Sequence, residues 1–367
     1  MNPQEHELTY PWAEPPAPGT LITLRPGVHW LRMPLPFALD HINLWLLDDE
    51  IEGRAGFTAI DCGITSEATR RAWEQLFDTA FDGKPLVRVL ATHFHPDHLG
   101  LAWWLVEGGE HKRWQAPLWM TLGEYAFGRM LSGNKDGQGE EAGRRAAAHF
   151  AANGLREHAA LEKIVTRGSG HYPKLVPDVP MSFRRIAEGD EIAIGPHGRK
   201  RLFRILVGFG HAPEHASLFC EEDRLLIAGD MVLPRISTNV SVFEIEPDGD
   251  PLPRYLRSLD RYLMLPADTL VLPSHGKPFI GLHRRVVQQH EHHQARLDEV
   301  LAACMRPSSA ADIVPVMFKR ELDLHQLTFA MGEALAHLHA LWRAGAVERR
   351  RGDDGVFRFE RIESARP

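Results

Sequence analysis

The chain has 367 residues, of which 44% are hydrophobic and 25% are charged, and this composition excludes a disordered or fibrous protein. A chain of this length can bury one large domain and a small one. The net charge of −7 and the pI near 6.3 provide no overall field that attracts nucleic acid or an anionic membrane. The sequence shows neither a signal-peptide pattern nor a run of about 18 apolar residues, so we expect a cytoplasmic protein without a membrane contact.

The predicted elements begin after a proline-rich N-terminal arm, residues 1–19. Strand-like runs follow at 21–24, 28–33, 42–48 and 57–61. A helix is expected next, with Thr65 or Ser66 as its N-cap and one apolar face. A strand over 86–92 then leads directly into His93. Successive strands followed by alternating strands and helices indicate an α/β fold with a mixed sheet, and a four-layer sandwich satisfies both features.

The second half of the chain contains two helix-rich regions. Residues of about 120–180 predict a helical insertion, which we interpret as a cap over the site. Strand patterns resume at 200–207, 217–227 and 269–273. After 282, helical patterns ending with 326–344 and a predicted hairpin, 346–350 with 356–360, indicate a winged-helix-like unit. We therefore expect an arm (1–19), an α/β domain (20–281) and a winged-helix-like C-terminal domain (282–367).

The strongest chemical signal is the segment THFHPDHLG, residues 92–100. In an extended segment His93 and His95 project to the same side and can share one metal ion. Pro96 suits the start of a helix, which would redirect Asp97 and His98 toward a second metal ion. A solvated polar loop is the alternative, and four ligand-type residues directly after an apolar strand disfavour it.

Two ligands for each ion leave both sites incomplete, so further ligands are required at the ends of other strands. His211 follows the strand that ends at Val207, Asp230 ends an apolar strand, and His275 follows the run 269–273. Taken singly, each of the three would more often be a loop or capping residue. As a carboxylate, Asp230 could bridge both ions.

The order HFHPDH, GHAPEH, AGD and SHG resembles the metallo-β-lactamase superfamily over about residues 20–280. The resemblance implies an αββα sandwich with the site at one edge of the sheets. It also implies that Asp61 and His215 lie behind the ligands, where Asp61 would orient a ligand histidine; an ordinary strand-end aspartate is the alternative. The implied ligands are His93, His95 and His211 for the first metal, Asp97, His98 and His275 for the second, and Asp230 as the bridge.

The ligand set suits two divalent metal ions, with zinc expected and iron or manganese as alternatives. A water shared by two cations is acidified enough to supply a bridging hydroxide, while the ions polarise a carbonyl or phosphoryl oxygen of the substrate. Asp97 can hold that hydroxide and later carry a proton to the leaving group. We therefore expect Asp97 to be a catalytic residue as well as a ligand.

Other candidate residues carry weaker signals. His171 and Tyr172, in the loop leaving the insertion, could contact substrate, with solvated-loop residues as the alternative. The run 290–293, His-Glu-His-His, is interpreted as a solvated helix face rather than a metal site. The cysteines are too few and scattered for a disulfide framework and are interpreted as packing residues; they are Cys62, Cys220 and Cys304.

The substrate must be inferred from the surroundings of the site. The chain is glyoxalase II-like in its metal motifs, but Ser274-His275-Gly276 stands where a true glyoxalase II has G-H-E-Y. Its C-terminal part resembles the winged-helix tail of the beta-lactamase-like protein 2 group, which includes an endoribonuclease. The acidic net charge and the weakly basic helix 326–344 disfavour nucleic acid as a partner, so we expect the tail to serve in packing or in a homodimer.

Three functional hypotheses follow. The leading one is hydrolysis of a small or medium thioester, ester or lactone. The enzymatic alternative is a phosphodiesterase or endoribonuclease. A non-catalytic binding module is the third, and the complete metal motifs weigh against it.

Overall fold

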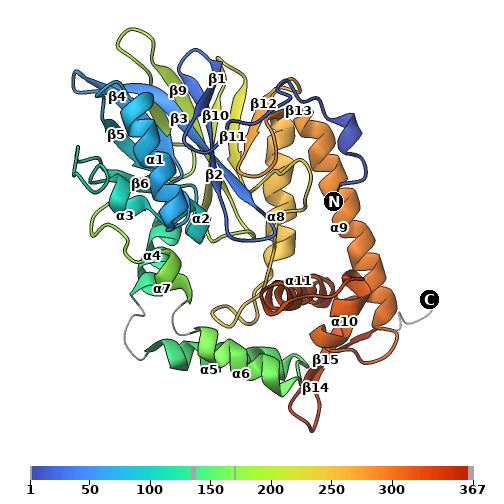
Figure 1. The fold of residues 1–367 in the computed structure, drawn as a ribbon. Coiled ribbons are helices and arrows are strands. Elements are labelled where there is room, and N and C mark those ends of the chain that lie inside the picture. The colour runs from blue at the N-terminus through green and yellow to red at the C-terminus, as the bar shows by residue number, and fades with distance from the viewer. Residues whose placement is uncertain (1, 134–137, 169–170, 363–367) are drawn as a thin grey trace.

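Two β-sheets lie face to face in this computed structural model, which describes residues 2–133, 138–168 and 171–362 (Figure 1). Both sheets are mixed, because β4 pairs in parallel with β5 and β11 pairs in parallel with β12, while most other neighbours are antiparallel. The first sheet runs in the order β1 (Leu21–Arg25), β2 (Val28–Pro34), β3 (His41–Ile51), β4 (Arg54–Ile60), β5 (Leu86–Leu90), β6 (Leu118–Met120) and β7 (Arg184–Arg185). The second runs in the order β13 (Phe279–Ile280), β12 (Leu270–Pro273), β11 (Leu225–Gly229), β10 (His215–Cys220), β9 (Arg201–Gly208) and β8 (Glu191–Ile194).

Alternation along the strands explains why each sheet is covered on both faces. In β3, Trp45 and Leu47 enter the core between the sheets, whereas Leu44 and Leu46 point to the outer face. Helix α1 (Glu67–Thr79) packs on that outer face through its apolar side. It begins at Ser66, whose hydroxyl accepts the backbone N–H of Thr69.

The outer face of the second sheet is covered in the same way. Leu226 and Ala228 of β11 pack with buried residues of α8 (Pro251–Asp260) and α9 (Leu282–Ala303). Figure 1 shows these two helices beside β12 and β13, opposite the side that carries α1. The predicted four-layer αββα sandwich is therefore confirmed.

The helical insertion is present and lies between the two halves of the sandwich in sequence. It comprises α4 (Leu122–Ser132), α5 (Gln138–Ala152), α6 (His158–Gly168) and α7 (His171–Leu175). Helices α5 and α6 form a pair that packs against the C-terminal part of the chain (Figure 1). The backbone N–H of Ala311 donates to the carbonyl oxygen of Asn153, and Arg156 pairs with Asp354 at 2.6 Å. At the base of the insertion, α4 and α7 contact the loops of the candidate site.

The C-terminal part contains the elements that the sequence predicts. After α9 come α10 (Ala310–Met317), α11 (Leu324–Arg343) and the antiparallel hairpin β14 (Val347–Arg351) with β15 (Phe357–Arg361). Capping boxes at Ser309 with Asp312 and at Asp323 with Gln326 fix the starts of α10 and α11. The winged-helix assignment and the boundary at 281/282 stay predictions.

Three details differ from the expectation. The run 217–227 is not one strand but two, β10 and β11, because the polar segment Glu221-Glu222-Asp223-Arg224 turns the chain between them. The N-terminal arm is tied to the sandwich, since Thr9 forms a bridge with Ile280. The histidine run in α9 is not wholly solvated, because the helix turns His293 into the core, where its ring is fully buried beside His337.

Candidate metal centre

The loop after β5 carries four of the predicted ligands. Strand β5 is buried along its whole length, and the chain leaves it at Thr92. Pro96 stands at the first position of the short helix α2 (Pro96–Leu99), as its fixed φ favours. This turn separates His93 and His95 from Asp97 and His98, as the sequence predicts.

The first group brings the ring nitrogens of three histidines together. Nε2 of His93 lies 2.9 Å from Nδ1 of His95 and 3.1 Å from Nε2 of His211. Oδ2 of Asp230 lies 3.4 Å from the same His211 nitrogen. Four ligand atoms from two loops and the end of β11 thus converge on one point.

The second group consists of Asp97, His98 and His275. Oδ2 of Asp97 lies 3.4 Å from Nε2 of His275 and 3.7 Å from Nε2 of His98. Asp230 stands between the groups, with Oδ2 3.6 Å from His98 Nε2 and Oδ1 3.5 Å from His275 Nε2. The structure therefore brings all seven predicted ligands together, in the two groups that the resemblance implies and with Asp230 in the bridging place.

Hydrogen bonds behind the rings fix which nitrogen faces inward. Nδ1 of His211 donates to the carbonyl oxygen of Asn239 at 2.7 Å, and Nδ1 of His275 donates to that of His41 at 2.8 Å. Nδ1 of His98 donates to Oδ2 of Asp61 at 2.8 Å. These bonds place an N–H on Nδ1 of each ring, so Nε2 is the nitrogen that faces inward and that could bind a cation in place of a proton.

The residues predicted to lie behind the ligands do so. Asp61 also accepts the backbone N–H and the hydroxyl of Thr92, so it holds the start of the motif as well as His98. His215 is fully buried, and its Nε2 accepts the backbone N–H of Asp230 at 3.1 Å. His215 thus holds the backbone of Asp230, whose carboxylate lies between the two groups. A side chain at Gly229 would meet this ring, because a Cβ there would lie 2.3 Å from His215 Nε2.

Two supporting residues were not found from the sequence. Asn43 is fully buried, and its amide donates to the carbonyl oxygens of Pro273 and Gly276 on either side of His275. Thr92 donates its hydroxyl to Asp61 and accepts from Nδ1 of His93. An asparagine in a strand and a threonine before a histidine are too common to signal such roles.

The candidate substrate residues fall partly outside what the structure describes. The side chain of His171 lies outside the described residues. The Tyr172 hydroxyl donates to the carbonyl oxygen of Phe94 at 2.5 Å, which ties α7 to the metal loop, the segment 92–95 between β5 and α2. Contact of either residue with substrate stays a prediction.

The histidines of the two ligand groups differ in the direction of their pKa shifts. Burial lowers the pKa of His95 to about 3 and that of His93 well below its usual value, and neighbouring histidines add to the effect. Burial also acts to lower the pKa of His275, but the Asp230 and Asp97 carboxylates outweigh it and raise it to about 10. In the first group, His93 and His95 are therefore neutral rings that can bind a cation. In the second group, the two carboxylates favour positive charge, whether as a proton on His275 or as a cation.

These features fit a pair of divalent cations. Buried His98 Nε2 and Asp230 Oδ1 have no partner in hydrogen-bonding geometry among the described residues, which is costly unless a cation binds them. Ligand atoms about 2.0–2.2 Å from a zinc ion stand roughly 3.3–3.6 Å apart in a tetrahedron, close to the spacings of the second group. Imidazole and carboxylate ligands of this kind suit zinc, iron or manganese.

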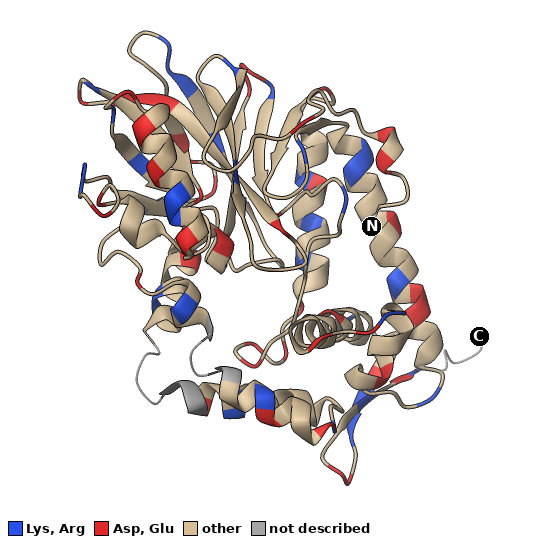
Figure 2. Ribbon diagram, in the orientation of Figure 1, with Lys and Arg blue, Asp and Glu red and all other residues tan. Residues whose placement is uncertain are grey.

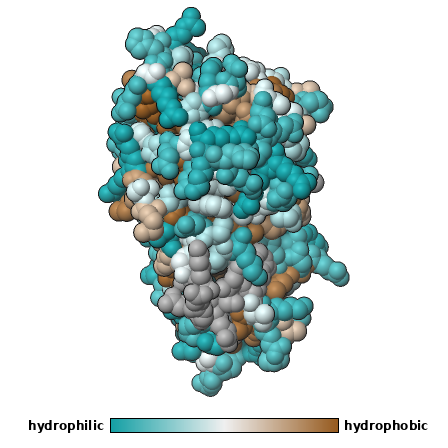
Figure 3. Space-filling model, turned by 60° about the vertical axis from the view of Figure 1, so that its left-hand side comes forward, coloured by the Kyte–Doolittle hydropathy of each residue, from teal (hydrophilic) through white to brown (hydrophobic). Residues whose placement is uncertain are grey.

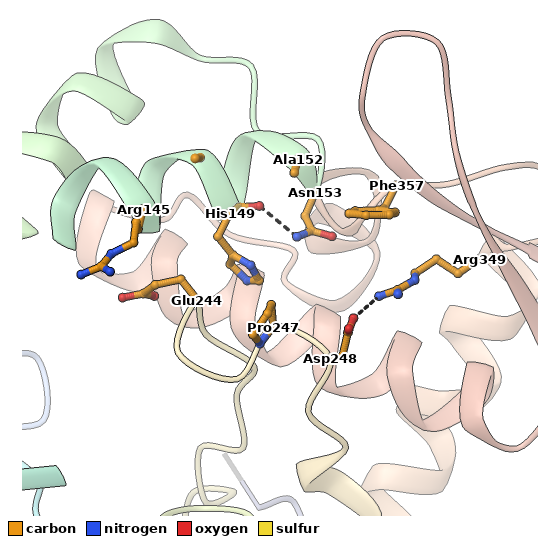
Figure 4. Close-up of a pocket in the computed structure, with 10 residues that line it drawn as sticks. Arg145, His149, Ala152, Asn153, Glu244, Pro247, Asp248, Arg349 and Phe357 are labelled. Atoms are coloured by element: carbon orange, nitrogen blue, oxygen red, sulfur yellow. Dashed lines mark hydrogen bonds and ion pairs between the residues drawn. The ribbon is translucent and has the colours of Figure 1, made fainter. Parts of the chain in front are cut away.

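A separate cavity of about 340 Å³ lies away from these residues (Figure 4). It is enclosed by α5, the loop 244–248 and the C-terminal hairpin. Two of its charged lining residues form an ion pair, Arg349 with Asp248 at 2.7 Å. The cavity marks the seam between the insertion and the C-terminal part, and it shares no residue with the metal centre.

The comparisons with known proteins agree with the class that the αββα sandwich and its converging ligands define. Residues 40–275 match the metallo-beta-lactamase superfamily, and residues 297–362 match the metallo-beta-lactamase-like C-terminal domain. The chain therefore belongs to the metallo-beta-lactamase superfamily. Among the described residues, no helix combines the length and the apolar character that crossing a membrane requires.

Relatives that align with nearly the whole chain are known. A beta-lactamase domain protein from Burkholderia ambifaria is 56% identical, with a TM-score of 0.91 over 98% of this chain and 99% of that one. A metallo-beta-lactamase family protein from Thermus thermophilus is 29% identical, with a TM-score of 0.72 over 93% of this chain and 100% of that one. The protein called probable metallo-hydrolase YqjP of Bacillus subtilis (strain 168) is 26% identical over 333 residues, 86% of this chain and 92% of the relative.

Proposed function

We propose that this protein is a two-metal hydrolase that acts on a small or medium thioester, ester or lactone. The observation that carries the proposal is the convergence of seven ligand side chains in two adjoining groups, with Asp230 between them. The name of the Bacillus subtilis relative, a metallo-hydrolase, supports the reaction class.

Two divalent cations, when bound, would acidify a water molecule and polarise the carbonyl oxygen of a substrate. The chain's own residues have other tasks. Asp61 and the carbonyl oxygens of His41 and Asn239 hold three ligand rings in one tautomer. Asp97 is the residue of the second group with the greatest access to solvent, since its side chain is 19% exposed while those of His98 and His275 are 0% and 4% exposed. Asp97 Oδ2 is therefore the atom placed to accept the proton of the attacking water and to return it to the leaving group.

The charge distribution supports an organic substrate over a nucleic acid. Basic and acidic residues are interspersed along the chain, including the C-terminal hairpin (Figure 2). In that hairpin Arg349 pairs with Asp248, Arg358 with Asp354 and Arg350 with Glu348. Arginines already paired with carboxylates bind phosphates less well, because the acidic partner must be displaced.

Among the residues that the structure describes, the side of the molecule in Figure 3 shows no large apolar surface. Hydrophilic residues dominate that face, and its apolar residues form small, separate patches. The base of the insertion stands directly against the metal loop, since Tyr172 of α7 is bonded to Phe94. A wall at that position accommodates a compact ester more readily than a long polymer.

An activity panel on the metal-loaded protein tests the proposal. The substrates are an acyl thioester, a lactone, bis-p-nitrophenyl phosphate and single-stranded RNA, with Asp230→Asn as the control that disables the centre. We expect metal-dependent hydrolysis of the thioester or lactone. RNA cleavage with a steep salt dependence and no acyl hydrolysis would favour the phosphodiesterase alternative, and no turnover by fully metallated protein would favour a binding module.

A further inference from the structure

A buried glutamate joins the two loops of the first metal group. Glu124 lies in the first turn of α4 and is fully buried. Its Oε2 accepts the backbone N–H of Phe94 at 3.0 Å, and its Oε1 accepts the backbone N–H of Glu214 at 2.6 Å. Phe94 stands between His93 and His95, and Glu214 stands between His211 and His215.

The contacts around Glu124 act on the same two residues. The Thr121 hydroxyl donates to the carbonyl oxygen of Glu214 at 2.8 Å, while the backbone N–H of Gly123 donates to the Glu214 side chain at 2.8 Å. On the other loop, the Tyr172 hydroxyl donates to the carbonyl oxygen of Phe94. The base of the insertion therefore holds both loops by their N–H and their C=O groups.

A carboxylate is the side chain that this arrangement requires. The ionised side chain offers two acceptor oxygens and no donor, which matches the backbone N–H group found on each of its oxygens. Burial raises the pKa of Glu124 to about 8, and the same two N–H groups act to lower it. The start of a helix also favours a negative charge at this position. An amide of the same shape would place its NH₂ group against one of the two backbone N–H donors, so one loop would lose its partner.

We propose that Glu124 is a positioning residue that fixes the distance between the two loops and thereby sets the affinity of the first group for its metal ion. The first group depends on this distance because His93 and His95 come from one loop and His211 from the other, with their nitrogens 2.9–3.1 Å apart. The inference rests on the metal centre of the proposed function, but not on any choice of substrate. It gives the base of the insertion a part in the metal centre, whereas the role of the insertion as a cap stays a prediction.

The test is Glu124→Gln, with metal affinity as the first readout. We expect one of two bound Zn²⁺ ions to bind about 10- to 100-fold more weakly in competition with a chromogenic chelator, the usual effect of removing a residue that orients ligands. In protein loaded with Co²⁺, the visible absorption of the weakened site should change, which a loss of global stability alone does not cause. Glu333→Gln, the same change at a glutamate of α11 outside the metal loops, is the matched control and should retain both affinities.

A milder variant covers the case in which Glu124→Gln does not fold. Tyr172→Phe removes only the hydrogen bond from the Tyr172 hydroxyl to Phe94. It should lower the affinity for the same metal ion by a few-fold. Wild-type affinities and an unchanged Co²⁺ spectrum in these variants would overturn the positioning role. A wild-type protein that binds no metal would overturn the metal centre itself, whereas two bound ions without turnover on any substrate would contradict only the proposed activity.

Discussion

At the scale of single residues, the two aspartates of the centre differ in their surroundings, and in our proposal only Asp97 also moves a proton. Asp97 contacts His275 and His98 and still reaches solvent, whereas Asp230 is enclosed by histidines of both groups. Burial acts to raise the pKa of Asp97, but His98 and His275 outweigh it and lower the pKa to about 2. Asp97 is therefore ionised at neutral pH, which is the state in which a carboxylate can bind a cation or accept a proton.

The first prediction concerns Asp97→Asn. An amide cannot accept the proton of the attacking water, so kcat should fall by a factor on the order of 100 or more. The ion held by His93, His95 and His211 should remain, because none of these residues is changed. Steady-state kinetics and elemental analysis of the same preparation check both parts. Asp178→Asn, an exposed change, should leave kcat unaltered; unaltered turnover of fully metallated Asp97→Asn would remove the proposed role.

The second prediction concerns Gly229, at the end of β11. Its φ is +54°, and a Cβ would lie 2.3 Å from His215 Nε2, the acceptor of the Asp230 N–H. Gly229→Ala should therefore displace His215, move the bridging carboxylate and weaken metal binding by about tenfold or more. Metal titration by calorimetry measures the loss.

Gly53→Ala is the control for the backbone effect. Gly53 has a φ of +76° and no atom within 4 Å of an added Cβ, so this change strains only the backbone, by about 1 kcal/mol. It should lower the melting temperature slightly and leave metal affinity intact. Equal metal binding in the two variants would show that the contact with His215 is unimportant.

At the scale of elements, the interface of α9 with α11 contains an uncharged histidine pair. His293 and His337 are fully buried, and Nδ1 of His293 lies 3.3 Å from Nε2 of His337. Burial lowers the pKa of His337 to about 4 and that of His293 well below its usual value. The fold therefore keeps both rings neutral.

The third prediction follows from this pair. The unfolded chain binds protons on these histidines below about pH 6.5. In the folded chain His337 binds one only near pH 4, and the pKa of His293 is also well below its usual value, so stability falls as the pH drops below about 6.5. The free energy of unfolding should fall by up to about 1.4 kcal/mol per pH unit for each ring. Urea unfolding of metal-free wild type and His337→Gln from pH 7.5 to 5 checks it, since the variant keeps an acceptor but loses one titrating group. Identical pH slopes would contradict the assignment.

The elements also show what a sequence can and cannot predict. The long strands and α1 were predicted because their apolar periodicity extends over five or more residues. Strands β6, β7, β8 and β13 have two to four residues, too few for a period to appear. The ligands were predicted because they stand in compact motifs. Glu124 was missed because its partners lie 30 and 90 residues away, and no local pattern marks such contacts.

At the scale of the whole molecule, the insertion and the C-terminal part extend one hydrophobic core. Phe150 of α5, Leu226 of β11 and Leu338 of α11 belong to the same buried cluster. The insertion thus touches the metal loops at its base and the C-terminal part at its far end. The relatives from Burkholderia and Thermus align with 98% and 93% of this chain.

A centre for two metal ions predicts how many ions the folded chain retains. Elemental analysis of gently purified protein, dialysed against metal-free buffer after loading, should approach two transition-metal ions per chain. Asp230→Asn, which alters the one carboxylate that faces both groups, should lower the occupancy of both. A folded, metal-saturated wild-type protein that retains one ion or none per chain would contradict the account.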